Sequence, residues 1–280
     1  MSDPLIRAAA LATHLDDPRW RLIDCRFDLT DPAAGRRAYA QAHLPGARYA
    51  DLDTDLSSPI TAGSGRHPLP DPAVFAARMA AWGIADETEV VVYDHGNALF
   101  ASRLWWLLRA RGHRRVRVLD GGLQAWVAAG LPLTDAPPVA VAPVAVETRP
   151  FVGWLSSADV ERALADDAIR LVDARAADRF AGQNETLDPV AGHVPGAVNH
   201  PLAANLAADG SFLPADELRR RWRATLEGRA PTDLVTMCGS GVTACHSLLA
   251  LERAGLTGGR LYAGSWSEWI RDPSRPVARG

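Results

Sequence analysis

A single cysteine stands where its thiol could act as a nucleophile. Residues 234–238 read Leu-Val-Thr-Met-Cys, the pattern of an apolar strand that ends at Cys238, and residues 239–243 read Gly-Ser-Gly-Val-Thr before a helical pattern begins. At the carboxyl end of a parallel strand, a Gly-x-Gly turn lets successive amides converge on one point, and the positive end of the next helix is directed there. We therefore predict a stabilised Cys238 thiolate, a nucleophile that needs no adjacent general base.

Three other interpretations of this loop remain open. Residues 239–244 match the dinucleotide-binding pattern G-x-G-x-x-A, but only 36 residues follow Ala244, too few for the rest of a nucleotide-binding sheet. A cysteine phosphatase would place an arginine six residues after its cysteine, where this chain has Ala244. Cys238 could also be an inert core residue, although the two glycines beside it would then weaken the strand and helix for no functional reason.

The chain is a duplication. Residues 22–26, Leu-Ile-Asp-Cys-Arg, recur as Leu-Val-Asp-Ala-Arg at 171–175, and His-Leu-Pro-Gly-Ala at 43–47 recurs as His-Val-Pro-Gly-Ala at 193–197. A repeat of this length is a duplicated domain, because the units of solenoid proteins run only about 20–50 residues.

The repeat defines the domain organisation. We predict a first domain over residues 1–133, a proline-rich linker over 134–150 and a second domain over 151–280. In each half, short apolar runs alternate with helix-period segments, which is typical of α/β domains whose parallel sheets are flanked by helices. Asp94 stands in the first half where Cys238 stands in the second. Without a thiol, the first domain is expected to be a non-catalytic scaffold that forms one wall of the cleft.

Composition excludes several functions. All 30 basic residues are Arg and none is Lys, which excludes Schiff-base lysines, the phosphate-loop lysine and the Ser-x-x-Lys pair. A net charge of −3 argues against nucleic acid as a partner. No apolar run approaches the ~18–20 residues that span a bilayer, and the start lacks a basic signal-peptide segment, so we expect no membrane association and a cytoplasmic location. The three cysteines, at 25, 238 and 245, suggest neither a disulfide framework nor a zinc site.

These motifs together resemble a tandem rhodanese-domain sulfurtransferase over essentially the whole chain. The resemblance implies that Cys238 takes a sulfane sulfur from a small anionic donor as a persulfide and passes it to cyanide, a small thiol or thioredoxin, with no cofactor or metal. The loop is similar to that of 3-mercaptopyruvate sulfurtransferases, whereas thiosulfate-preferring members carry basic residues where this chain has Gly239 and Ser240. Mercaptopyruvate is therefore the predicted donor; thiosulfate and a non-catalytic sulfur-binding module are the alternatives.

The same resemblance implies roles for particular residues. Arg179 would bind the donor anion with two parallel hydrogen bonds. Ser240, His67 and Asp53 would form a proton relay. The amides around the nucleophile would hold its charge and bind the donor, and they belong to Gly239, Gly241, Val242 and Thr243.

The sequence departs from the family pattern at one place. Mercaptopyruvate-specific members usually have a second Arg before the His-x-Pro-Gly turn, but residues 183–189 read Gln-Asn-Glu-Thr-Leu-Asp-Pro without a basic residue. A missing charged hydrogen bond of about 1.5–3 kcal/mol is enough to change the preferred donor. The neutral residues after Cys238 thus favour mercaptopyruvate as the donor, whereas the missing Arg argues against it.

Structural roles are the competing interpretation for several residues. Ser240 and Thr243 could cap the helix after the loop, and His67 could be a structural residue of a Gly/Pro-rich loop. Arg175 is expected to pair with Asp173 or Asp178. His43 and His193 are expected to hold their turns by imidazole hydrogen bonds, and Cys25 and Cys245 to lie in the core, although a redox role of Cys245 stays open.

Overall fold

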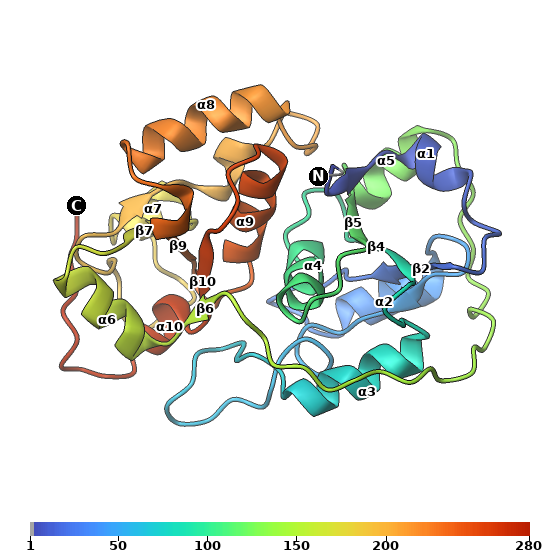
Figure 1. The fold of residues 1–280 in the computed structure, drawn as a ribbon, viewed down its shortest axis with the longest axis horizontal. Coiled ribbons are helices and arrows are strands. Elements are labelled where there is room, and N and C mark those ends of the chain that lie inside the picture. Colours follow the sequence, from blue (N-terminus) through green and yellow to red (C-terminus); the bar gives the residue numbers. More distant parts are fainter. Residues whose placement is uncertain (1–2) are drawn as a thin grey trace. The chain divides into compact units, whose positions relative to one another are not determined.

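The computed structural model describes residues 3–280, so the first two residues of the predicted first domain lie outside the described part. The chain forms two compact units (Figure 1). The first contains residues up to Ser58, Leu69–Val152 and Ala208–Phe212, and the second contains Pro59–Pro68, Gly153–Ala207 and Leu213–Gly280. Each unit thus includes one short segment from the other half of the sequence.

Each unit is built on a five-stranded sheet in which every pairing is parallel. The first sheet has the order β1-β5-β4-β2-β3 and the second the order β6-β10-β9-β7-β8. The strands of the first are β1 (Leu5–Ile6), β2 (Trp20–Asp24), β3 (Arg48–Tyr49), β4 (Glu89–Tyr93) and β5 (Val116–Leu119). Those of the second are β6 (Trp154–Leu155), β7 (Arg170–Asp173), β8 (Val198–Asn199), β9 (Leu234–Met237) and β10 (Arg260–Tyr262). The two orders are the same when each strand is matched with its repeat, so the duplication extends to the topology.

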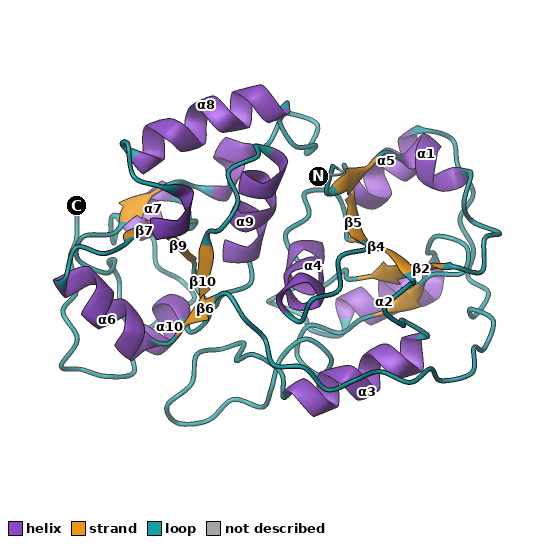
Figure 2. Cartoon of the chain, viewed as in Figure 1, coloured by secondary structure: helices purple, strands orange, loops and turns teal. Residues whose placement is uncertain are grey.

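Helices flank both sheets (Figure 2). In the first unit they are α1 (Ala8–Ala12), α2 (Ala34–Gln41), α3 (Pro72–Trp82), α4 (Ala101–Ala110) and α5 (Gly122–Ala128). In the second they are α6 (Ser157–Ala165), α7 (Ala177–Phe180), α8 (Ala215–Leu226), α9 (Ala244–Arg253) and α10 (Ser265–Trp269), with short 3-10 turns at Leu202–Asn205 and Pro231–Asp233. The predicted fold class, two parallel-sheet α/β domains related by duplication, is confirmed.

Local sequence signals explain where these elements begin and end. Helix α3 begins at Pro72, and the side chain of Asp71 accepts hydrogen bonds from the amides of Ala73 and Val74. It ends at Gly83 in the left-handed conformation. Residues 135–150 form neither helix nor strand, in keeping with their proline content.

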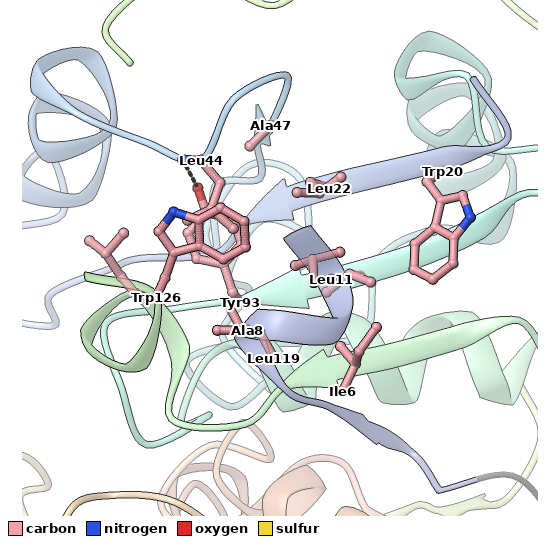
Figure 3. Close-up of a cluster of buried hydrophobic side chains, with 12 residues drawn as sticks. Ile6, Ala8, Leu11, Trp20, Leu22, Leu44, Ala47, Tyr93, Leu119 and Trp126 are labelled. Atoms are coloured by element: carbon pink, nitrogen blue, oxygen red, sulfur yellow. Dashed lines mark hydrogen bonds between the residues drawn. The ribbon is translucent and has the colours of Figure 1, made fainter. Parts of the chain in front are cut away.

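Apolar side chains cover both faces of the sheets, as parallel sheets require. On one side of the first sheet, Trp126 and Leu11 pack with Leu44, and the Tyr93 hydroxyl accepts a hydrogen bond from the Leu44 amide (Figure 3). The equivalent cluster of the second unit contains Trp266 and Trp269. Cys25 and Cys245 are buried, as predicted.

The repeated Asp-x-Arg and His-x-Pro-Gly motifs contact each other in the same way in both units. The Arg26 guanidinium pairs with Asp24 and donates to the Ala42 carbonyl, next to the turn histidine. Arg175 pairs with Asp173 and donates to the Gly192 carbonyl, also next to the turn histidine. This confirms the pairing of Arg175 with Asp173.

The turn histidines are structural, as expected. His43 bonds the carbonyls of Tyr39 and Ala136 through its two ring nitrogens, and His193 bonds the carbonyl of Phe180. Both rings also stack on an aromatic neighbour. Within residues 3–280, no helix has the length and apolar character needed to cross a membrane.

The buried ion pair gives a test of this framework. Asp173 and Arg175 have side-chain exposures of 0% and 1%, so Arg175→Ala would leave an uncompensated buried carboxylate. We expect a loss of about 3–5 kcal/mol in the free energy of unfolding, measured by urea denaturation. As control, Arg162→Ala removes an Arg that is 73% exposed and pairs with Asp159; its effect should stay below about 1 kcal/mol. Equal effects of the two substitutions would show that the buried pair has no special structural importance.

Candidate active site

The site lies at the carboxyl end of β9, which sits between β10 and β7 in the second sheet. Strand β9 ends at Met237, Cys238 follows directly, and α9 begins at Ala244. The residue Cys238 is only 1% exposed. Its Sγ accepts a hydrogen bond from the Gly241 amide at 3.2 Å. A main-chain dipole is therefore directed at the sulfur, as the loop sequence predicts.

Gly241 holds this geometry because no other residue fits its position. Its φ is +76°, in the left-handed region, and a Cβ atom there would lie 2.2 Å from the Ala263 carbonyl oxygen. The loop therefore turns tightly against the end of β10, and this turn aims the Gly241 amide at the sulfur.

The first turn of α10 fixes the backbone on the other side of the nucleophile. The amides of Trp266 and Ser267 donate to the carbonyls of Cys238 and Gly239 at 3.0 and 2.9 Å. The Cys238 amide donates to Ser265 Oγ at 3.1 Å. Cys238 and Gly239 are thus held by backbone and hydroxyl contacts before any ligand arrives.

Two of the three predicted relay residues meet. His67 lies in the 59–68 segment of the second unit, and its Nδ1 is 2.7 Å from Ser240 Oγ, with both residues buried. Asp53 belongs to the first unit, where its amide donates to Asp51 and burial raises the pKa of its carboxyl. A role for Asp53 in the relay stays a prediction.

The capping role predicted for Thr243 is wrong. Thr243 occupies the N-cap of α9 in a helical conformation, and its side chain makes no capping hydrogen bond. A helical φ and ψ at this position turns the side chain away from the amides that a capping oxygen would reach, because capping residues are normally extended. Ser240, the other predicted cap, bonds His67 instead.

Arg179 is held beside the residue after the nucleophile. Its Nε and Nη2 donate to Glu185 at 3.1 and 2.8 Å, and Nη2 also lies 3.4 Å from Asp188. Its side chain is 19% exposed. A Cβ atom at Gly239 would lie 3.7 Å from Nη2 of Arg179. The predicted anion-binding Arg is thus in the site, fixed by two carboxylates.

The carboxylates come from the stretch that lacks the second Arg of the family pattern. Burial alone would raise the pKa of Glu185, but hydrogen bonds from Arg179 and from the amides of Leu187 and Asp188 hold it below its usual value. Burial raises the pKa of Asp188, although Arg66 and Arg179 oppose this shift. Among the described residues, no cluster of His, Cys, Asp and Glu could hold a metal ion.

Comparison with known proteins identifies the family. The family model described as Rhodanese-like domain matches residues 7–129 and again residues 156–272. The chain belongs to the rhodanese family. It carries two copies of the rhodanese domain, one in each predicted half.

Full-length relatives support this assignment. A Pseudomonas aeruginosa protein named Probable 3-mercaptopyruvate sulfurtransferase is 50% identical over 282 residues, which cover 100% of this chain and 99% of that protein. Arabidopsis thaliana Thiosulfate/3-mercaptopyruvate sulfurtransferase 1, mitochondrial, is 31% identical, with coverage of 99% of this chain and 78% of that protein. The crystal structure of the 3-mercaptopyruvate sulfotransferase SseA of Escherichia coli superposes with a TM-score of 0.80 at 32% identity, covering 95% of this chain and 100% of that one. The predicted sulfurtransferase class is confirmed.

The first rhodanese domain has an equivalent loop, but a different residue follows its strand. Asp94 is buried at the position of Cys238, and its carboxylate accepts hydrogen bonds from the amides of Gly96, Ala98, Phe100 and Ala101. Burial raises the pKa of Asp94, although the hydrogen bonds from these four amides oppose this shift. Asp94 is thus a buried, hydrogen-bonded loop carboxylate.

Sequence reasoning missed Ser265. Its φ is +54°, a strained value for a non-glycine residue, and its first-domain counterpart Gly122 has the same φ. Ser265 Oγ accepts from the Cys238 amide and donates to the Tyr262 carbonyl, two bonds that glycine could not make. The alignment of Gly121-Gly122 with Gly264-Ser265 was the available signal. A serine that replaces a turn glycine adopts an unfavourable backbone conformation, which indicates that its side chain has a specific role.

The loop geometry predicts the effect of adding one methyl group. Gly241→Ala should displace the amide that bonds Cys238 Sγ, because the Cβ would meet the Ala263 carbonyl. A hydrogen bond to a charged group contributes about 1.5–3 kcal/mol, so its loss corresponds to a tenfold to hundredfold slower reaction. The rate to measure, by mass spectrometry, is that of Cys238 with iodoacetamide.

Gly196→Ala is the matched control. Gly196 also has a positive φ, +81°, but its nearest atom to a Cβ is 3.9 Å away. This variant carries the same backbone strain of about 1–2 kcal/mol without the collision, so Cys238 should react at the normal rate. The interpretation of the loop is wrong if both variants slow the reaction equally.

Proposed function

We propose that the protein transfers a sulfane sulfur from 3-mercaptopyruvate to a thiol or cyanide acceptor through a persulfide on Cys238. The observation that carries this proposal is the Gly241 amide on Cys238 Sγ, with the Arg179 guanidinium at neighbouring Gly239. The site thus combines a stabilised sulfur nucleophile with a fixed cation for an anionic donor.

The first half-reaction forms a sulfur–sulfur bond and breaks a carbon–sulfur bond. The Cys238 thiolate attacks the donor sulfur, the electron pair of the carbon–sulfur bond leaves with the carbon as the pyruvate enolate, and the proton of the donor thiol ends on that carbon. In this proposal Ser240 and His67 move this proton, a role supported by the 2.7 Å between Oγ and Nδ1.

The second half-reaction returns the enzyme to its starting state. An acceptor thiolate or cyanide attacks the outer sulfur, and the Cys238 thiolate leaves, so the kinetics should be ping-pong. Thioredoxin or a small thiol is the proposed acceptor, and the proposed location is the cytoplasm. Asp53 completes the relay in this proposal, and the amides of Gly239, Val242 and Thr243 join that of Gly241 around the donor.

Thiosulfate is the second candidate donor. It supplies the same sulfane sulfur, and its leaving group, sulfite, departs as a dianion without needing a proton. The Arabidopsis relative is named for both donors. The neutral pair Gly239 and Ser240 after the nucleophile favours mercaptopyruvate, whose leaving carbon does need a proton.

Mass spectrometry tests sulfur transfer directly. Incubation with mercaptopyruvate should add the mass of one sulfur atom to the intact protein, and cyanide should remove it. Cys238→Ser should gain no sulfur, whereas Cys245→Ser should behave as the wild type, because Cys245 is buried on α9 and donates to the Gly241 carbonyl. A wild-type mass unchanged by both mercaptopyruvate and thiosulfate would leave only a non-catalytic module.

If Ser240 and His67 form a proton relay, the effect of removing His67 on kcat should depend on the donor. His67→Ala should lower kcat for mercaptopyruvate by about 10²–10⁴, the usual contribution of a positioned acid or base. The same variant should change kcat for thiosulfate far less, because sulfite leaves without a proton. Stopped-flow measurement of persulfide formation with each donor separates the two cases. Equal losses with both donors would mean that His67 positions the loop and moves no proton.

A further inference from the structure

We propose that the first unit carries a ligand site of its own, which binds a small organic cation made of an apolar body and an ammonium or amidinium group. The site is a cavity of about 690 Å³. Pockets that bind small molecules typically measure about 300–1,000 Å³. All of the lining residues belong to the first unit, so the site involves no residue of the second unit and goes beyond sulfur transfer.

The cavity lies at the carboxyl ends of two paired parallel strands. Residues 26–29 follow β2 and residues 94–100 follow β4, and these two segments line it together with residues 208–210. In open α/β sheets, ligands bind outside the carboxyl ends of the strands. In the second unit, Cys238 follows the equivalent strand β9. The first unit therefore has a cavity at the place in its own sheet where the second unit has its nucleophile.

Apolar side chains form much of the cavity wall. Phe27 and Phe100 contact each other edge to face, with their ring centroids 5.5 Å apart, and both line the cavity. Leu29, which is 45% exposed, and Leu99 add aliphatic surface. The face of an aromatic ring attracts a positive charge. The wall thus suits an apolar ligand, and its rings favour one that carries a cation.

Two carboxylates from different segments give the cavity a negative charge. Asp28 accepts hydrogen bonds from the amide and the hydroxyl of Thr30, and Asp209 accepts the same pair from Ser211. These hydrogen bonds lower the pKa of both carboxyl groups. Both carboxylates are therefore ionised at neutral pH, and they attract a cationic ligand into the cavity.

The one guanidinium among the described lining residues does not balance this charge. It belongs to Arg26, which is 8% exposed and is bound to the Asp24 carboxylate and the Ala42 carbonyl. Asp94 also lines the cavity, but its oxygens already accept four amide hydrogen bonds. The exposed carboxylates of the cavity thus remain available to a ligand.

The first unit also lacks the arginine of the second unit's site. The turn histidines of the two units stack on Tyr39 and on Phe180, and each bonds the main-chain carbonyl of the same aromatic residue. Tyr39 and Phe180 are therefore equivalent. The residue before Phe180 is Arg179, whereas the residue before Tyr39 is Ala38. The equivalent sites of the two units thus suit ligands of opposite charge.

Benzamidine and benzamide test this charge preference. The two molecules have nearly the same shape, but only benzamidine is a cation. We expect benzamidine to bind about tenfold more tightly, because it adds a charge to the same ring. The measurement is a titration followed by ligand-observed NMR at about pH 8, where an ordinary imidazole is uncharged. Failure of benzamidine to bind, or equal affinities for the two probes, would overturn the proposal.

Three Asp→Asn variants locate the site. Asn keeps the oxygen that accepts the hydrogen bonds of the turn but removes the charge, so Asp28→Asn and Asp209→Asn should each weaken benzamidine binding about twofold to fivefold. Benzamide binding should not change. Asp272→Asn is the matched control, because Asp272 of the second unit accepts the amide and the hydroxyl of Ser274 in the same way. Equal effects of all three variants, or no effect of any, would show that benzamidine does not bind in this cavity.

Phe27→Leu tests the aromatic wall. Leucine keeps an apolar side chain but removes the ring face, so the affinity for benzamidine should fall about twofold to fivefold. An unchanged affinity refutes a cation site at this wall. A circular dichroism spectrum and a melting curve of each variant confirm that it is folded. None of these measurements uses sulfur transfer, so the cation site is tested whether or not Cys238 carries sulfur.

Discussion

The hydrogen bond from the Gly241 amide to Cys238 Sγ is the interaction on which the rest of the site depends. It requires a left-handed residue at 241, and the close approach of the Ala263 carbonyl restricts that residue to glycine. That carbonyl is in place because β10 lies parallel to β9, and the first turn of α10 then fixes the carbonyls of Cys238 and Gly239. Cys238 is therefore positioned by backbone contacts from the neighbouring strand and helix.

In both domains this loop directs main-chain amides at the side chain that follows the strand. In the first domain a carboxylate, Asp94, collects four amides, and in the second a sulfur occupies the equivalent position. The reactivity of the two groups differs, because a carboxyl group whose lone pairs accept four hydrogen bonds is a poor nucleophile. Duplication thus provides two equivalent loops, and in the proposed reaction the residue at the strand end decides which of them carries sulfur.

The sequence predicts the features that depend on neighbouring residues. The duplicated motifs, the strand ending at Cys238 and the glycine turn are local patterns, and the structure has each where it was expected. Arg66 could not be predicted, since it meets Asp188 across 122 residues from a Gly/Pro-rich loop without periodicity. The alignment of Ser265 with Gly122 marked its position, but the contacts of its hydroxyl with Cys238 and Tyr262 depend on how the chain packs and could not be read from the sequence. Contacts between distant loops depend on the packing of whole domains, which local patterns do not encode.

The acidic residues beside Arg179, the proposed anion-binding residue, have a physical explanation. A guanidinium placed directly on a thiolate would stabilise it strongly, but a less basic thiolate is also a weaker nucleophile. In this site Glu185 and Asp188 hold Arg179, and Asp188 holds Arg66, beside Gly239. The sulfur itself receives a neutral amide. In the proposed reaction the charge of the Arg179 guanidinium is thereby available to the donor anion, and the sulfur keeps the reactivity that its attack on the donor requires.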